Sequence, residues 1–239
     1  LTLANGVTVN EGSSTWNFNT TGALPLAMQG GTGTATIVMA GGQWRAGNGA
    51  ASQTLQIGSG VTVQGFGTLT DSTAASIANG GTITSNTAAQ TLTINPTTFS
   101  NSGTLNVTAG TMTLSSTNLA NTGTITTAAG AVLNLGGAST ALTTATLGTI
   151  SNAGTVNLAA TLDNTSATFN TGAFGGTLSL SGTIKNGTLL GSTLNSSSGT
   201  LNNVTIGSSL TESGTLNVST VLTLANGVTV NEGSSTWNF

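Results

Sequence analysis

Residues Asn101-Ser102-Gly103-Thr104-Leu105-Asn106-Val107 contain the pattern that decides the fold. After the glycine, aliphatic and polar side chains alternate, and successive side chains of a β-strand point to opposite sides of the backbone. Leu105 and Val107 are therefore predicted to face a core, while Thr104 and Asn106 face water. The same Gly-Thr-aliphatic pattern recurs at Gly81-Thr82-Ile83, Gly123-Thr124-Ile125, Gly154-Thr155-Val156, Gly176-Thr177-Leu178, Gly199-Thr200-Leu201 and Gly214-Thr215-Leu216.

The spacing of these repeats indicates the size of one structural unit. The glycines at positions 81, 103, 123, 154 and 176 follow one another at intervals of 22, 20, 31 and 22. Such a unit buries too few aliphatic side chains to fold alone, so its copies must stack, about 4.8 Å apart. We therefore predict an all-β chain that forms a parallel β-helix, or β-solenoid, with roughly 20–30 residues per turn. Stacking predicts one continuous apolar ladder, formed by Ile83, Leu105, Ile125, Val156 and Leu178.

An asparagine lies two positions before several of the glycines, at Asn79, Asn101, Asn121 and Asn152. Asparagine tolerates the left-handed αL conformation, and its side chain bonds to nearby backbone groups. We predict that these four residues form corners of the solenoid in that conformation. Stacked copies are expected to bond to one another as an asparagine ladder.

The opening stretch, LTLANGVTVNEGSSTWNF from Leu1 to Phe18, recurs letter for letter from Leu222 to Phe239, 221 positions later. Identity over this length indicates tandem duplication. We predict that residues 1–221 form one unit of a tandem array and that residues 222–239 begin the next identical unit. Neither end resembles the polar cap that closes a solenoid, so the solenoid is expected to continue beyond both ends. One unit would add roughly 50 Å of length.

The composition limits the partners of the chain. Charged residues make up 3% of the 239 residues, and Arg45 and Lys185 are the only bases, so the phosphate contacts needed for nucleic-acid binding are excluded. There is no long apolar stretch of the kind that crosses a bilayer as a helix, so membrane insertion is not expected. A surface with so few charges lacks the repulsion that keeps proteins apart. We therefore expect the chain to associate with itself, both head to tail and laterally.

The chain lacks the side chains that catalysis and metal binding usually need. The chain has no histidine and no cysteine, and its acids, Glu11, Asp71, Asp163, Glu212 and Glu232, are isolated in the sequence. Acid–base catalysis and calcium binding both require clustered groups. We therefore expect these acids to be solvated surface residues, and we expect no enzymatic activity, no cofactor and no metal.

Trp44 and Arg45 mark the one place where an aromatic ring, a base and amide side chains gather. Sugar-binding surfaces often combine such groups, so this pair is a candidate surface or glycan contact. The alternative is that Trp44 packs on a turn or between fibres and that Arg45 is solvated. Trp16 and Phe18, repeated as Trp237 and Phe239, are predicted to be packing residues.

Threonine-rich strands also suggest ice binding, in which a flat array of Thr-x-Thr pairs orders water. Thr82-Ile83-Thr84 and Thr124-Ile125-Thr126 fit that pattern. Elsewhere the outward pair is Thr104 with Asn106, Thr155 with Asn157 or Thr177 with Ser179. An ice-binding array would therefore be uneven.

The strand motif, as in Asn101 to Val107, resembles the passengers of bacterial autotransporters and filamentous-haemagglutinin-type exoproteins. The resemblance covers about residues 55–230 and implies a bacterial protein exported to the cell surface. Our leading expectation is a structural segment of an extracellular, cell-surface filament built from tandem β-solenoid repeats. The alternative is an adhesin that binds glycans or surfaces, and ice binding is the third possibility.

Overall fold

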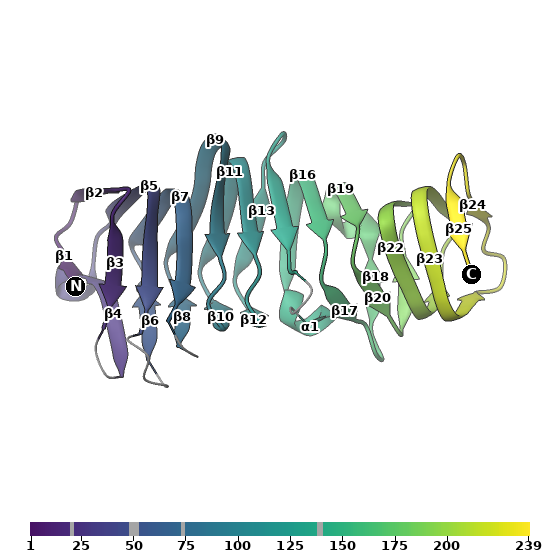
Figure 1. Ribbon diagram of the computed structural model, residues 1–239, viewed down its shortest axis with the longest axis horizontal. Helices are drawn as coiled ribbons and strands as arrows, with labels where there is room; N and C mark the ends of the chain where they lie inside the picture. Colours follow the sequence, from purple (N-terminus) through teal and green to yellow (C-terminus); the bar gives the residue numbers. More distant parts are fainter. Residues whose placement is uncertain (20–21, 48–52, 73–74, 138–140) are drawn as a thin grey trace.

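The structure is a computed structural model and describes residues 1–19, 22–47, 53–72, 75–137 and 141–239. The chain is all-β, and its parallel strands stack into a β-solenoid of about ten coils (Figure 1). The N-terminus and the C-terminus lie at opposite ends of the long axis. The predicted fold class is confirmed.

Each coil passes through three stacks of parallel strands, which we call the first, second and third faces. The first face begins with β2 (Thr8–Gly12), the second with β3 (Thr15–Phe18) and the third with β4 (Ala23–Met28). The first halves of β5, β7, β9, β11 and β16 stack on β2, and their second halves continue the stack of β3. The chain visits the three faces in this order in every coil.

In the part of the chain that the structure describes, seven long strands bend around a corner and cover more than one face. They are β5 (Ala35–Ala46), β7 (Val61–Asp71), β9 (Thr82–Ile94), β11 (Thr104–Leu114), β16 (Thr149–Leu158), β22 (Thr193–Ile206) and β23 (Leu210–Leu224). The remaining short strands are β1 (Thr2–Leu3), β6 (Thr54–Ile57), β8 (Ser76–Asn79), β10 (Thr98–Asn101), β12 (Asn118–Asn121), β13 (Thr124–Thr127), β14 (Val132–Leu135), β15 (Ala141–Thr143), β17 (Thr161–Asp163), β18 (Thr168–Asn170), β19 (Gly175–Leu180), β20 (Thr183–Lys185), β21 (Thr188–Leu190), β24 (Val230–Asn231) and β25 (Thr236–Asn238).

Short helical segments interrupt the strands at α1 (Thr144–Leu147), η1 (Gln29–Gly31) and η2 (Thr171–Phe174). Thr143 caps α1, because its hydroxyl accepts a hydrogen bond from the backbone N–H of Thr146 at 3.1 Å. Past α1, the first face continues with the first half of β16. Further along the rod, β18 pairs with β21, β21 with the last residues of β22, and these with the last residues of β23. These insertions widen the coil locally.

The core is made of inward side chains stacked in columns, as the alternation predicted. The predicted single ladder is wrong in one respect, because it divides between two faces. Ile83, Leu105 and Ile125 stack on the first face and continue to Ile150. Val156 and Leu178 belong instead to the second face, where Val156 stacks on Leu133. All five predicted ladder residues are nevertheless buried.

The physical reason is that the Gly-Thr motif marks a corner without specifying which one. The coil from Thr124 to Thr149 is longer than the coil before it, because it includes α1. The long interval between Gly123 and Gly154 therefore contains this coil and one further face. Gly154 opens the second face, whereas Gly123 opens the first.

Glycine is required at these corners because the neighbouring coil leaves no room for a side chain. A Cβ atom on Gly103 would lie 2.1 Å from the carbonyl oxygen of Gly81, and one on Gly123 would lie 2.1 Å from that of Gly103. The predicted αL conformation of Asn79, Asn101, Asn121 and Asn152 is wrong, because all four lie in strands and none has a positive φ. At these corners the backbones of successive coils are in contact. The residue two positions after the extended asparagine therefore has no room for a side chain.

Gly103→Ala should therefore destabilise the protein by about 2–3 kcal/mol, since the added methyl group collides with rigid backbone on the neighbouring coil. Gly80→Ala is the control, because a Cβ there would lie no closer than 3.4 Å to another atom, which is ordinary van der Waals contact, and it should change stability by less than about 0.5 kcal/mol. Urea denaturation of both variants measures the difference. Equal, small effects would contradict the crowded corner.

Candidate functional site

The predicted surface pair of Trp44 and Arg45 is not a platform. Trp44 is 0% exposed in the core, where it stacks on Trp16 with ring centroids 5.6 Å apart and planes 3° from parallel. Arg45 is exposed and donates to the side-chain oxygen of Gln43 at 3.1 Å. The two side chains point to opposite sides because they are neighbours on one strand. Trp44 therefore cannot contact a glycan.

Two of the acids that were expected at the surface are buried. Glu11 is 6% exposed and Glu212 is 0% exposed. Glu11 Oε2 accepts a hydrogen bond from Trp44 Nε1 at 2.6 Å, and Glu212 Oε2 accepts one from Trp237 Nε1 at 3.2 Å. In both pairs the tryptophan lies one coil beyond the glutamate and one face further on. Both pairs therefore form the same type of interaction, with the tryptophan in the same place relative to the glutamate.

The alternation contained a signal for this burial. Glu11 lies two positions after Val9, and Glu212 lies two positions after Leu210. Each glutamate therefore points to the same inward side of its strand as that aliphatic residue. The pairing itself was missed because Glu11 and Trp44 lie far apart in the sequence, as do Glu212 and Trp237. Finding these partners requires the length of each coil.

Each buried carboxylate keeps one oxygen, Oε1, without a hydrogen-bond partner in the described part of the chain. Burial raises the pKa of Glu11 above its ordinary value, and the hydrogen bond from Trp44 partly offsets this rise. An ionised Glu11 therefore opposes folding.

Asn79, Asn101 and Asn121 lie in an inward-facing ladder, one above another at the corner between the third and first faces. Asn79 Nδ2 donates to Asn101 Oδ1, and Asn101 Nδ2 donates to Asn121 Oδ1, each at 2.7 Å. Asn121 then donates to the carbonyl oxygen of Leu147, because α1 interrupts the stack. Asn152 lies outside this ladder, at the next corner, where it accepts from the N–H of Gly154 and donates to the oxygen of Thr177.

The first face carries an outward column of threonines in register over successive coils. It consists of Thr8, Thr36, Thr62, Thr82, Thr104, Thr124 and Thr149. The neighbouring outward column is mixed and contains Asn10, Val38, Gln64, Thr84, Asn106, Thr126 and Ser151. The face therefore has one regular row of threonines beside an irregular row.

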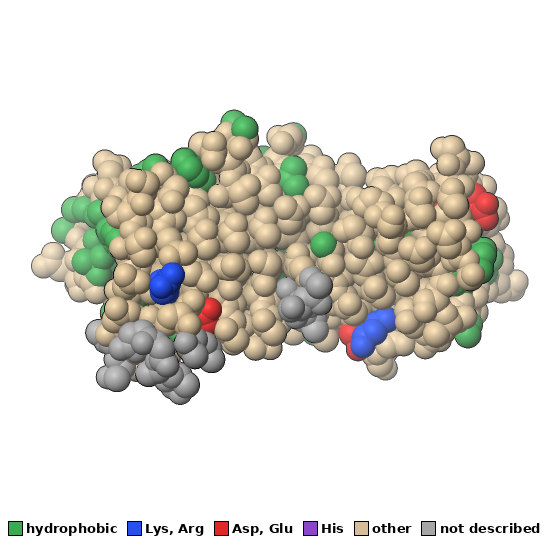
Figure 2. Space-filling view, viewed as in Figure 1, with side chains coloured by type: hydrophobic (Ala, Val, Ile, Leu, Met, Phe, Trp, Pro, Cys, Tyr) green, Lys and Arg blue, Asp and Glu red, His purple; other side chains and the backbone are tan. Residues whose placement is uncertain are grey.

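Charged side chains are sparse on the side of the molecule in Figure 2. Lys185 and Asp163 form an ion pair at 3.1 Å between adjacent coils. The pKa of Asp163 is lowered, first by the hydrogen bond from the Thr165 hydroxyl and then by those from Lys185 and Asn186. Within the described residues, no group of three or more potential metal-binding side chains occurs, and no helix there has the length and hydrophobicity to cross a bilayer.

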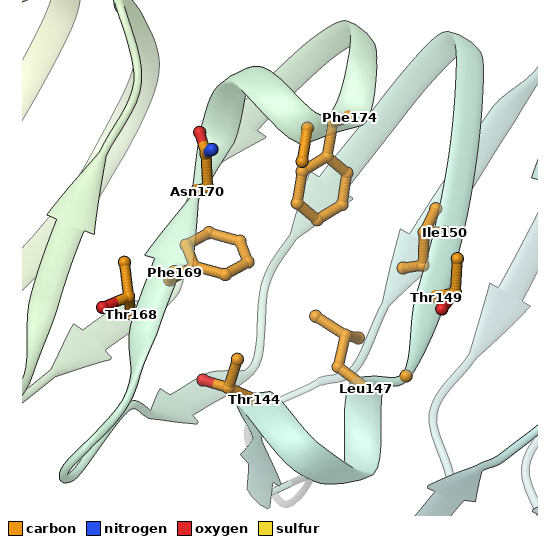
Figure 3. Close-up of a pocket in the computed structure, with 10 residues that line it drawn as sticks. Thr144, Leu147, Thr149, Ile150, Thr168, Phe169, Asn170 and Phe174 are labelled. Atoms are coloured by element: carbon orange, nitrogen blue, oxygen red, sulfur yellow. The ribbon is translucent and has the colours of Figure 1, made fainter.

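A cavity of about 300 Å³ lies where the coil widens between β16 and β18 (Figure 3). Leu147, Ile150, Phe169 and Phe174 form its apolar lining. Thr144, Thr149, Thr168 and Asn170 supply hydroxyl and amide groups. No acid or base lines it, so it offers shape and hydrogen bonds but no acid–base chemistry.

Comparison with known proteins gave no relative: no protein-family model, curated protein or solved structure matches the chain.

Asn101→Ala should cost about 2 kcal/mol, because it removes the middle of a buried ladder and leaves the amide groups of Asn79 and Asn121 without that partner. Asn118→Ala is the matched control on a neighbouring strand. Asn118 is exposed, so its replacement should cost less than about 0.5 kcal/mol. Thermal or urea unfolding distinguishes the two, and equal losses would show that the ladder adds nothing.

Glu11→Gln should remove a pH dependence of stability, because glutamine still accepts the Trp44 hydrogen bond without burying a charge. The folded pKa of Glu11 is raised, so the wild type should lose stability as pH rises above the ordinary value of 4.5. The variant should be the more stable protein at about pH 8 and should lose its advantage near about pH 4. Unfolding curves of both proteins across this range test this. A constant difference between them would refute the assignment.

Proposed function

We propose that this chain is a segment of an extracellular, cell-surface filament in which tandem solenoid units are joined end to end. The observation that supports it most is the position of the second copy of the repeated stretch. Its strands β24 and β25 pair with β23 in parallel, with Leu210 beside Val230 and Leu216 beside Trp237. The second copy of the repeated stretch thus occupies the place of one more coil, which is where the start of a following unit would lie.

The physical character of the rod supports the same role. Its stability is distributed over stacked coils, so length can be added by repetition without a new core. A surface of threonine, asparagine and serine with few charges permits lateral contact between rods. Export to the cell surface rests on the resemblance of the strand motif to bacterial surface proteins.

Two other roles, adhesion and ice binding, are supported by fewer observations. For adhesion to glycans or surfaces, the predicted aromatic contact, Trp44, is buried, and only Arg45 of the predicted pair is exposed. Ice binding has the threonine column of the first face in its favour, but its second row is mixed.

A tandem protein, residues 1–221 followed directly by residues 1–239, tests the filament. If the units continue one solenoid, small-angle X-ray scattering should show a single straight rod about twice as long as the original chain, and denaturation should remain cooperative across the junction. Two rods joined by a bend or a flexible link would overturn the proposal.

A further inference from the structure

The cavity between β16 and β18 lies where the pairing of strands is interrupted. The first half of β16 pairs with β13 of the preceding coil, from Thr149 beside Thr124 to Asn152 beside Thr127. On its other side it has no strand partner before Asn152 in the described residues. In the next coil, β18 pairs with β21 and not with β16. The cavity therefore opens through the wall of the solenoid, where no strand pair joins two successive coils.

A hydrogen bond from a buried side chain ties each side of the opening to the coil on its far side. On the side of α1, Asn121 Nδ2 in the preceding coil donates to the carbonyl oxygen of Leu147 at 3.1 Å. On the side of η2, the hydroxyl of Thr171 donates to the carbonyl oxygen of Thr193 in the following coil at 3.0 Å. Asn121 and Thr171 are both buried. The two sides are thus held apart, and the cavity is formed before any ligand arrives.

Four apolar side chains converge on the floor of the cavity (Figure 3): Leu147, Ile150, Phe169 and Phe174. The two phenylalanine rings pack edge to face, with centroids 5.4 Å apart and planes at 65°. Ile150 is 8% exposed and Phe174 is 7% exposed, whereas Ile125, which stacks on Ile150 from the preceding coil, is 0% exposed. The floor is therefore a part of the apolar core that a small molecule can reach from outside.

Polar side chains form the rim of the cavity. Thr149, Thr168 and Asn170 alternate with the inward side chains of their strands and are exposed. The hydroxyl groups of Thr149 and Thr168 make no hydrogen bond within the described part of the chain. Asn170 uses only Oδ1, which accepts from the N–H of Gly172 at 3.0 Å. Two hydroxyl groups and one amide Nδ2 thus remain available to a ligand at the rim.

We propose that this cavity binds a small, uncharged aromatic alcohol, with its ring on the floor and its hydroxyl group at the rim. An aromatic ring suits the floor because it continues the edge-to-face packing of Phe169 and Phe174. A cavity of about 150 Å³ is enough for benzene, so the volume of about 300 Å³ accommodates one ring with a short chain. This site goes beyond the filament function and does not depend on it.

The lining also argues against other classes of ligand. A carboxylate or an ammonium group would lose water without meeting an opposite charge, because no lining residue is charged. A sugar ring carries hydroxyl groups around its whole edge, and the apolar floor offers them no partners. The ring of Phe169 is 3% exposed, so it has no open face on which a sugar could stack.

A titration of the full chain with 2-phenylethanol, followed by methyl NMR, tests the site. The methyl resonances of Leu147 and Ile150 should shift and saturate, with a Kd of roughly 1 mM or below. Those of Ile83 and Leu105, which lie on coils further along the rod, should stay unchanged. An absence of shifts, or shifts at Ile83 and Leu105 alone, would overturn the proposal.

Phenylacetate is the matched ligand control, since it has the same ring and a similar length but carries a carboxylate. It should bind at least about tenfold more weakly than 2-phenylethanol, because its charge has no partner in the cavity. Equal affinity for both compounds would refute the assigned class of ligand.

Ala173→Leu tests the location of the site, because Ala173 lines the cavity and a leucine there takes up part of its volume. This variant should weaken the binding of 2-phenylethanol at least about fivefold. Ala145→Leu is the matched control, since Ala145 is exposed on α1 and lies outside the lining, and its affinity should equal that of the wild type. Equal affinity of all three proteins would place the ligand elsewhere and contradict the site. The methyl shifts of the wild type decide the matter by themselves where a variant fails to fold.

Discussion

Every coil of this protein depends on in-register stacking against the coils on either side. Parallel strands about 4.8 Å apart supply the backbone hydrogen bonds, and each inward side chain packs on the residue at the same place in the next coil. This spacing brings backbones so close at the corners that Gly103 and Gly123 have no room for a methyl group. It also leaves any terminal coil with one uncovered side. Length, crowded glycine corners and open ends thus follow from one constraint.

Polar groups inside the core specify how coils meet. The ladder of Asn79, Asn101 and Asn121 satisfies amide groups only when successive corners align. The Glu11–Trp44 and Glu212–Trp237 bonds join a glutamate in one coil to a tryptophan in the next. Apolar columns tolerate many arrangements of similar side chains, whereas a buried carboxylate without its donor is costly. These few groups therefore favour one register and one direction of stacking.

The fold could be predicted because alternation and repeat spacing are local properties of the chain. Thr104-Leu105-Asn106-Val107 indicates a strand with one buried side, and glycine marks the corner before it. The face on which a motif lies depends on the length of every preceding coil, and α1 lengthened one of them. Val156 was therefore assigned to the column of Ile125, although it lies on the next face. The alternation along their strands indicates that Trp44 and Glu11 face inward. A tryptophan beside an arginine, and an acid isolated in the sequence, suggested surface roles instead.

We propose that successive units continue one solenoid and that each is rotated by one face, because β24 and β25, the copies of β2 and β3, lie one face further on than β2 and β3 do. Helical reconstruction of assembled filaments by electron cryo-microscopy measures this directly, as the rise and rotation that relate one unit to the next. We expect unbroken coil stacking, a rise of roughly 50 Å per unit and a rotation of about one third of a turn. A break in the stacking at the repeated coil, or units related by translation without rotation, would contradict it.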